Sequence, residues 1–240
     1  MRLDKFVADS NGITRSQAKK LIKDGLISVN QKIIKQTKFQ IDVNLDNVQV
    51  NKMSIAYQEY RYYMMNKPKD VVSATRDNSQ KTVIDLVAKI NQKGLFPVGR
   101  LDKDTTGLLI LTNDGEFAHK LLAPKKHVSK IYRALVAGEI TADTIQIFAT
   151  GITLKNGETT KPALLKILTV DSEKNEAEIE ITITEGKYHQ IKRMFGAVSM
   201  KVLELKRIQM GNLKLDDKIK AGKYRELTLD ELRCLKEAIR

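Results

Sequence analysis

A polar loop between two short apolar runs in the middle of the sequence constrains the fold of this chain most. The first run ends at Gly99, and the second, from Leu108 to Thr112, is rich in residues that favour strands. Asn113-Asp114-Gly115 follows and is typical of a tight turn, because Asp and Gly readily adopt positive φ. The pattern predicts a loop over residues 100–107, held between two buried strands, and functional groups are common on such loops.

Charged side chains are concentrated in this loop. The carboxylates Asp102 and Asp104 alternate with the cations Arg100 and Lys103. An aspartate has an unperturbed pKa of about 3.9 and is ionised at neutral pH unless burial reverses this. We expect Asp104 to be a loop carboxylate that caps a backbone amide.

The net charge of the chain indicates a polyanionic partner. The 240 residues include 42 Lys and Arg against 29 Asp and Glu, a formal net charge of +13. A surplus of this size favours nucleic acid as the partner, although a solubilising surface is the alternative.

The composition also argues against several other classes of protein. A single cysteine, Cys234, and three histidines without a ligand-like cluster predict no disulfide and no metal site. Glycine-rich phosphate loops are absent, so we expect no nucleotide cofactor and no other cofactor. No apolar run approaches the roughly 18 residues of a membrane span, and no secretory signal is visible. We expect a monomeric protein of a reducing cytoplasm, without a membrane partner.

Residues 1–23 predict two short helices, and residues 14–17 give the second one a capping box. Arg15, Lys19 and Lys23 recur every four residues and form a basic stripe along it. Such a stripe can lie against an RNA backbone. The alternative is an ordinary solvated helix face.

A small hairpin is predicted next, over residues 26–34. The order of helix, basic helix and hairpin resembles the S4 RNA-binding module, with Gly25, Val29 and Asn30 at matching positions. The resemblance covers about residues 1–50 and implies binding to structured RNA.

Other elements follow from periodicity. Apolar and polar residues alternate over 177–185, which predicts a half-buried strand. A helix is predicted from near Gln190, with Lys192 and Arg193 in its first turn, where the helix dipole disfavours cations. A nearby carboxylate or phosphate would explain them. We also expect strands at 61–68 and 130–137 and helices at 81–91, 116–122 and 141–150.

The central loop resembles the signature of one enzyme family. Residues 99–108 read Gly-Arg-Leu-Asp-Lys-Asp-Thr-Thr-Gly-Leu, which resembles that of the small-subunit (RsuA) type of pseudouridine synthase. Four further segments resemble its other motifs in the same order: Asn66-Lys67-Pro68, Lys130-Ile131-Tyr132, residues 185–194 and Leu205-Lys206-Arg207. One departure is Asp70, where the family usually has glycine, which puts the local loop shape in question.

The resemblance implies a fold and a division into domains. The expected fold class is α+β, with a small S4-like module and linker over residues 1–60. Residues 61–240 would form the catalytic domain, with a mixed, mainly antiparallel sheet flanked by helices and the Asp loop in a central cleft.

The same resemblance implies an enzyme that isomerises uridine to pseudouridine in RNA without a cofactor. Asp102 would be the catalytic carboxylate, either attacking the sugar or removing one of its protons. Lys192 is the first choice for the cation that pairs with Asp102, and Arg193 is the second.

Three further residues would bind the RNA. Tyr132 would be the catalytic platform that stacks on the target uracil. Leu205 would close the pocket behind the base, and Arg100 would contact RNA.

The Tyr-His-Gln sequence at residues 188–190 resembles enzymes that modify small-subunit rRNA. We therefore expect 16S rRNA as the substrate, in an assembling 30S particle. The alternatives are the same reaction on large-subunit rRNA or tRNA, a non-catalytic RNA-binding or ribosome-assembly factor and, third, a DNA-binding protein.

Overall fold

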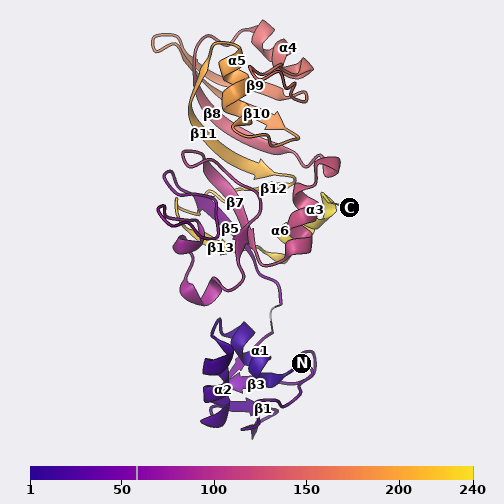
Figure 1. Ribbon diagram of the computed structural model, residues 1–240. Helices are drawn as coiled ribbons and strands as arrows, with labels where there is room; N and C mark the ends of the chain where they lie inside the picture. Colours follow the sequence, from indigo (N-terminus) through magenta and orange to yellow (C-terminus); the bar gives the residue numbers. More distant parts are fainter. Residues whose placement is uncertain (58, 240) are drawn as a thin grey trace. The chain divides into compact units, whose positions relative to one another are not determined.

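The computed structural model describes residues 1–57 and 59–239. The chain divides into two compact units (Figure 1). The N-terminal unit contains Met1–Arg61 and Val87–Leu95, and the larger unit contains Tyr62–Leu86 and the chain from Phe96 onward.

The N-terminal unit packs two helices on a small antiparallel sheet of order β2-β1-β3-β4. Its core consists of apolar residues that share the inner faces of these elements, among them Leu3, Phe6, Ala18, Ile22, Ile27 and Val48. The predicted capping box is confirmed, because Thr14 and Gln17 exchange side-chain and backbone hydrogen bonds. The elements are α1 (Leu3–Ser10), α2 (Arg15–Lys23), β1 (Ile27–Val29), β2 (Lys32–Ile33), β3 (Val48–Val50), β4 (Met53–Ile55) and the short 3-10 turn η2 (Lys89–Asn91).

The larger unit is built on one mixed sheet of order β13-β5-β7-β11-β8-β10-β9, with β6 and β12 paired at its sides. Every paired strand is antiparallel to its neighbour except β7 and β11, which run parallel. The strands are β5 (Tyr62–Lys67), β6 (Phe96–Pro97), β7 (Thr106–Thr112), β8 (Lys130–Ala137), β9 (Leu164–Asp171), β10 (Glu176–Ile183), β11 (Lys201–Met210), β12 (Leu213–Lys214) and β13 (Tyr224–Glu226). The fold class predicted from the sequence is confirmed.

Helices cover the sheet in two places (Figure 1). Near one end, α4 (Ala142–Thr150) packs on β9 and α5 (Gln190–Ala197) packs on β11. At the other end, α3 (Gly115–Leu122) and α6 (Leu229–Glu237) share a core with β5 and β7. The functional loop, residues 100–105, lies between β6 and β7, directly before the parallel strand pair.

The helix predicted over residues 81–91 is not formed. The segment contains two 3-10 turns, η1 (Ile84–Leu86) and η2. The backbone N–H and the hydroxyl of Thr82 both donate to Asp85 Oδ2, at 2.8 and 2.9 Å. Such local side-chain bonds compete with helix formation. Thr82 also pairs with Val72 in an isolated bridge, so the segment enters the fold in an extended conformation.

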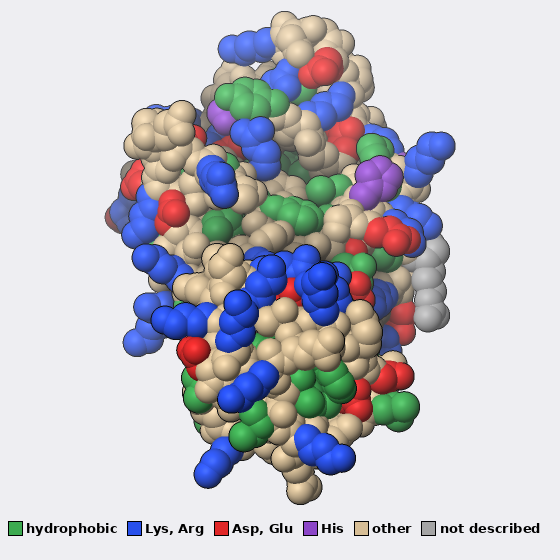
Figure 2. Space-filling model, turned by 60° about the horizontal axis from the view of Figure 1, so that its bottom comes forward, with side chains coloured by type: hydrophobic (Ala, Val, Ile, Leu, Met, Phe, Trp, Pro, Cys, Tyr) green, Lys and Arg blue, Asp and Glu red, His purple; other side chains and the backbone are tan. Residues whose placement is uncertain are grey.

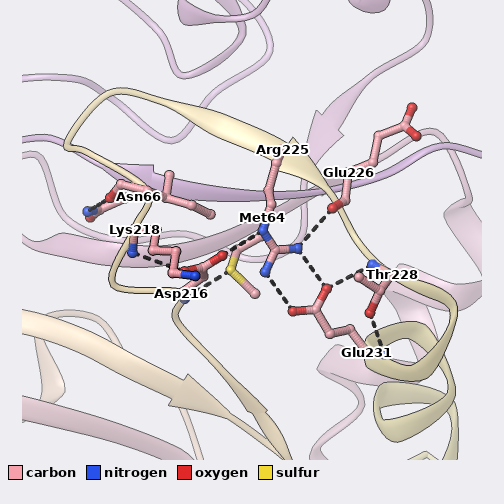
Figure 3. Close-up of polar contacts among 9 residues, drawn as sticks. Met64, Asn66, Asp216, Lys218, Arg225, Glu226, Thr228 and Glu231 are labelled. Carbon is pink, nitrogen blue, oxygen red and sulfur yellow. Dashed lines mark hydrogen bonds and ion pairs between the residues drawn. The ribbon is translucent and has the colours of Figure 1, made fainter.

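A polar network fixes the edge strand β13 (Figure 3). The Arg225 guanidinium donates to Asp216 Oδ2 at 2.8 Å and to both oxygens of Glu231 at 2.7 and 2.8 Å. The hydrogen bond from Arg225 holds the pKa of the Glu231 carboxyl below its usual value. Asn66 on β5 adds a bond from its side-chain amide to Ile219 O at 2.8 Å. These bonds anchor β13 and its loop to the end of β5 that leads into the Asn-Lys-Pro segment.

Gly107 allows the close approach of β7 and β11. A Cβ atom at this position would lie 2.2 Å from the carbonyl oxygen of Arg207 and 2.9 Å from its nitrogen. Gly107 also has φ +97°, which side chains rarely adopt. The parallel pairing that places Leu205 beside the functional loop therefore requires glycine here.

We expect Gly107→Ala to lower the free energy of unfolding of the larger unit by about 3 kcal/mol, because overlap with backbone adds to the strain of positive φ. Chemical denaturation followed by circular dichroism measures it. Gly196→Ala is the matched control, since an added Cβ within α5 meets nothing within 4 Å. The control should be neutral or stabilising. Equal stability of the two variants would show that β7 and β11 can separate at little cost.

Candidate active site

A small cavity, of about 80 Å³, lies where the functional loop meets the start of α5. Its lining includes five of the site residues predicted from the sequence, which come from four separate elements: Arg100, Asp102, Tyr132, Lys192 and Leu205. A larger cavity of about 540 Å³ lies beside Arg133 and Glu178 and contains none of the three predicted catalytic side chains. The smaller cavity is therefore the candidate active site.

Lys192 lies between two carboxylates. Its Nζ is 2.5 Å from Asp104 Oδ1 and 3.5 Å from Asp102 Oδ2. On the other side of Asp102, His189 Nε2 is 3.5 Å from Oδ1. Asp102 therefore has a nitrogen atom of a neighbouring side chain near each of its oxygens, while its side chain remains 27% exposed and open to a substrate.

Asp104 has a different role from the one expected. It accepts two short bonds from Lys192, so its principal partner is an ammonium group rather than a backbone amide. Burial raises the pKa of Asp104, but the hydrogen bond and charge of Lys192 outweigh this and hold the pKa below its usual value. The two residues are 88 positions apart in the chain, which is why the local pattern did not indicate the pair.

Arg193 points away from the cavity. Its Nη2 lies 3.1 Å from Glu158 Oε2, and its Nη1 donates to the Tyr188 carbonyl at 3.3 Å. Of the two cations considered as partners of Asp102, only Lys192 reaches it. Cations in the first turn of a helix are disfavoured by the helix dipole, which predicted a carboxylate or phosphate nearby. Both cations of α5 do lie beside carboxylates, Lys192 beside Asp104 and Arg193 beside Glu158.

Tyr132 and Leu205 form apolar walls of the cavity. Both side chains are 7% exposed, and they come from the neighbouring strands β8 and β11. The alternating pattern of β8 directs Tyr132 inward while Arg133 is exposed. Arg100 is exposed at the start of the loop, where it also borders a second cavity.

Lys67 belongs to the Asn-Lys-Pro motif, but the sequence alone indicates no role for its side chain. The structure buries this side chain completely at the end of β5. Its ammonium donates to the carbonyls of Pro68, Lys103 and Thr105, at 3.0, 3.1 and 2.9 Å. Two of these carbonyls flank Asp104, so Lys67 holds the backbone of the functional loop. The available signal was a lysine in the strand that begins Tyr-Tyr-Met-Met, two positions after that run and directly before proline.

The departure at Asp70 leaves the loop intact. Asp70 has φ +63°, the left-handed conformation that glycine adopts easily and that aspartate tolerates. Its backbone N–H donates to the Lys103 carbonyl at 2.9 Å, the same oxygen that Lys67 contacts. Ser73 adds a reciprocal pair of hydrogen bonds with the backbone of Leu101, at 2.8 and 3.0 Å. The turn thus supports the functional loop with aspartate in place of glycine.

A second cavity, of about 290 Å³, shares Arg100, Tyr132 and Gly186 with the first. Its wall includes Lys130 and the buried Arg207, whose Nη2 has no hydrogen-bond partner. Burial, and then the charge of Arg207, lowers the pKa of Lys130 to about 8. The surroundings of Tyr132 are therefore electropositive on this side.

The predicted basic stripe lies in the N-terminal unit. Lys19 and Lys23 are exposed on α2. Arg15 is half-exposed and pairs with the buried Asp4 at 3.2 Å. Burial raises the pKa of Asp4, but Arg2 and Arg15 together hold it below its usual value. On the face drawn in Figure 2, Lys and Arg side chains are more frequent than acidic ones.

The described part of the chain contains neither a cluster of metal ligands nor a helix that could span a membrane. Among residues 1–57 and 59–239, no group of three or more His, Cys, Asp and Glu side chains could hold a metal ion. Over the same described ranges, no helix is both long and apolar enough to cross a membrane.

Both units of the chain are similar to known protein families. The RNA pseudouridylate synthase family matches residues 61–197, and the S4 domain family matches residues 1–46. The chain is 45% identical to the uncharacterized RNA pseudouridine synthase YtzG of Bacillus subtilis, over 99% of each chain. It is 40% identical to the ribosomal small subunit pseudouridine synthase A of Vibrio cholerae, over 97% of this chain and 98% of that protein.

Two further matches have similar coverage. The chain is 38% identical to the ribosomal large subunit pseudouridine synthase B of Bacillus subtilis, over 98% of this chain and 95% of that protein. A crystal structure of a pseudouridylate synthase matches with a TM-score of 0.68 and 37% identity, covering 98% of this chain and 99% of that one.

The ammonium of Lys67 gives the site a testable pH dependence. Burial lowers the pKa of Lys67 to about 8 from 10.5, although the nearby aspartates oppose this. Between these two values the unfolded chain binds more protons at this residue, so stability should rise with pH through this window.

We expect the free energy of unfolding of the wild type, relative to Lys67→Met, to increase by about 1 kcal/mol or more from pH 7.5 to pH 9.5. Urea denaturation at both pH values measures it, and the comparison cancels other titrating groups. Lys69→Met is the control, since this exposed lysine pairs only with Glu204 at the surface. If this difference in the free energy of unfolding decreased as the pH rose, the folded state would favour the ammonium form of Lys67 more than the unfolded chain does.

Proposed function

The chain belongs to the RNA pseudouridylate synthase family, and on that premise we propose that it isomerises a specific uridine of 16S rRNA to pseudouridine. The observation that supports this most is the convergence of Asp102, Lys192 and Tyr132 on one cavity. A carboxylate, a cation to keep it ionised and a flat apolar platform are the groups that the reaction needs.

The reaction exchanges one bond to the sugar for another. The bond between C1′ and N1 of uracil breaks, the base turns, and C5 bonds to C1′. C5 loses a proton to solvent and N1 gains one, so no cofactor is consumed. We propose that ionised Asp102 acts on the sugar, by attack at C1′ or by removal of a sugar proton. Either route requires the carboxylate to be exposed on the side that faces the substrate.

Lys192 would place a positive charge beside Asp102 without blocking it. Because Asp104 accepts the short bonds from Lys192, the 3.5 Å contact to Asp102 is longer and easier to displace. The ammonium still contributes its charge at this distance. We propose that Asp104 positions Lys192, and that His189 orients the other oxygen of Asp102.

The base would bind between the apolar walls. Stacking on an aromatic ring contributes roughly 1–3 kcal/mol per base. Tyr132 places its phenol ring in the wall of the cavity. Leu205 would pack against the uracil from β11. A uridine in structured RNA must first be extruded, which costs a few kcal/mol, and phosphate contacts from Arg100 at the rim would offset part of this cost.

The N-terminal unit would dock the enzyme on structured RNA. The S4 similarity covers residues 1–46, which include the exposed cations of α2. We propose residues 1–60 as the docking domain and its linker and residues 61–240 as the catalytic domain. We propose Lys19 and Lys23 as direct phosphate contacts, with Arg15 shared between RNA and Asp4. Arg193 would assist indirectly by holding the Tyr188 backbone.

The proposed substrate is small-subunit rRNA in an assembling 30S particle, modified by a monomer in the cytoplasm. The relative that acts on the ribosomal small subunit supports this choice, and the bacterial origin of the relatives supports the location. The second candidate is large-subunit rRNA, because the large-subunit relative is nearly as similar, at 38% against 40% identity.

We expect Asp102→Asn to lower tritium release from small-subunit rRNA labelled at uridine C5 by at least about 1000-fold, because the variant lacks the ionised carboxylate. Asp104→Asn is the matched control from the same loop. It removes the anchor of Lys192 but keeps the reacting group, so we expect a loss of about 10-fold.

Three results would contradict parts of this proposal. Full activity in Asp102→Asn would remove its catalytic role. Release only from large-subunit rRNA would select the second candidate. No release from either RNA, free or in ribosomal particles, together with retained binding, would indicate a non-catalytic RNA-binding factor.

We expect the double variant Lys19→Gln, Lys23→Gln to reduce the slope of log affinity against log salt by about 1.8, because each phosphate contact contributes about 0.9. Filter binding to small-subunit rRNA between 50 and about 200 mM salt measures the slope. Lys174→Gln, in the β9–β10 turn, removes an exposed cation that pairs with Asp171. This control loses one charge instead of two, so a change half as large as that of the double variant would assign the effect to net charge rather than to α2.

A further inference from the structure

Tyr188 is a large aromatic side chain that remains 73% exposed beside the candidate active site. Its ring stacks on the imidazole of His189, with centroids 3.8 Å apart and an angle of 18° between the planes. His189 lines the cavity and lies 3.5 Å from Asp102. Tyr188 is thus separated from the reacting carboxylate by a single ring.

The loop that presents Tyr188 is held in place. The side chain of Gln190 accepts a bond from the Lys187 backbone at 2.9 Å and donates to Glu185 at 2.8 Å. The ammonium of Lys187 donates to the Thr159 carbonyl at 2.9 Å, and Arg193 donates to the carbonyl of Tyr188 itself. The exposed ring therefore belongs to a well-bonded turn, and this preorganisation reduces the entropy lost on binding.

The stacked pair leaves one ring face available. His189 covers one face of Tyr188, so most of the exposed area belongs to the opposite face and the edge. An exposed aromatic face of this kind gains free energy by stacking on a nucleobase, which is the flat group that RNA supplies. Cations nearby, Lys187 and Lys192, favour the strand that carries such a base.

We propose that the Tyr188–His189 pair is a stacking platform for the base next to the target uridine. This inference rests on the proposed function, because it assumes that the target uridine enters the cavity of Asp102. The platform would fix the neighbouring nucleotide while the target nucleotide is extruded, and it would do so through stacking rather than through charge.

The absence of tryptophan from the sequence offers a direct test. Tyr188→Trp places a single indole at the platform, and Leu229→Trp places one at an exposed position at the start of α6. On titration with small-subunit rRNA, we expect the fluorescence at position 188 to fall at least about two-fold and that at position 229 to stay unchanged. Equal quenching at both positions, or no quenching at position 188 while filter binding shows bound RNA, would overturn the platform.

A second test uses an RNA that the wild type modifies, with an abasic nucleotide on the 5′ or the 3′ side of the target. Tyr188→Ala should lower kcat/KM about 10-fold or more, mainly through KM, whereas Tyr188→Phe retains the ring and should restore it. Removal of the neighbouring base should harm the wild type but not Tyr188→Ala. The proposal would be overturned if removal of the neighbouring base lowered kcat/KM of Tyr188→Ala as much as that of the wild type, on either side of the target. It would also be overturned if Tyr188→Phe were as impaired as Tyr188→Ala.

The two proposals can fail separately. The fluorescence titration reports contact with RNA and requires no turnover. Quenching at position 188 in a protein without tritium release would remove the proposed reaction, and with it the assignment to the base beside the target uridine, but would leave the contact between Tyr188 and RNA. Tritium release without quenching at position 188 would support the proposed reaction and remove the stacking role of Tyr188.

Discussion

The buried ammonium of Lys67 is the interaction on which the arrangement of the site depends. Its bonds to the carbonyls of Pro68, Lys103 and Thr105 tie the end of β5 to the loop that carries Asp102. Burial of an ammonium group is costly, and the three carbonyls together with the nearby aspartates offset part of the cost, since burial still lowers the pKa of Lys67. The same cation thus holds the loop and contributes positive charge beneath its carboxylates. Removal of this one contact would free the backbone and take a donor from each of the three carbonyls, of which that of Lys103 would keep the N–H of Asp70.

One lysine serving two carboxylates explains how Asp102 can be both ionised and available. A direct short bond from Lys192 to Asp102 would stabilise the carboxylate but would also occupy the oxygen that must reach the sugar. Asp104 accepts the short bonds instead, and Asp102 receives a longer contact at 3.5 Å. The electrostatic field falls slowly with distance, whereas a hydrogen bond is lost within a few tenths of an ångström. The arrangement therefore separates charge stabilisation from occupancy of the reacting atom.

Features encoded by neighbouring residues were predictable, and features created by distant contacts were not. The capping box at Thr14 and the strand at 130–137 follow from residues within a few positions of one another, and the structure confirms them. The helix expected at 81–91 failed because Thr82 pairs with both Asp85 and Val72, which the apolar spacing does not show. Motifs far apart in the chain indicated which residues would meet. They could not indicate that Asp104 would hold Lys192, since only the folded loop places those two groups together.

Positive charge alone cannot place one uridine in the cavity, because phosphate contacts are the same along any RNA strand. The aromatic rings of Tyr132 and Tyr188 would supply a second kind of contact, since the first is buried in the cavity and the second is exposed beside His189, which lines it. Stacking depends weakly on salt and strongly on geometry, whereas phosphate contacts behave in the opposite way. The exposed cations of α2 would accordingly govern how strongly the RNA is held. The rings of the larger unit would govern which nucleotide is held against Asp102, so affinity and site selection can vary independently within one chain.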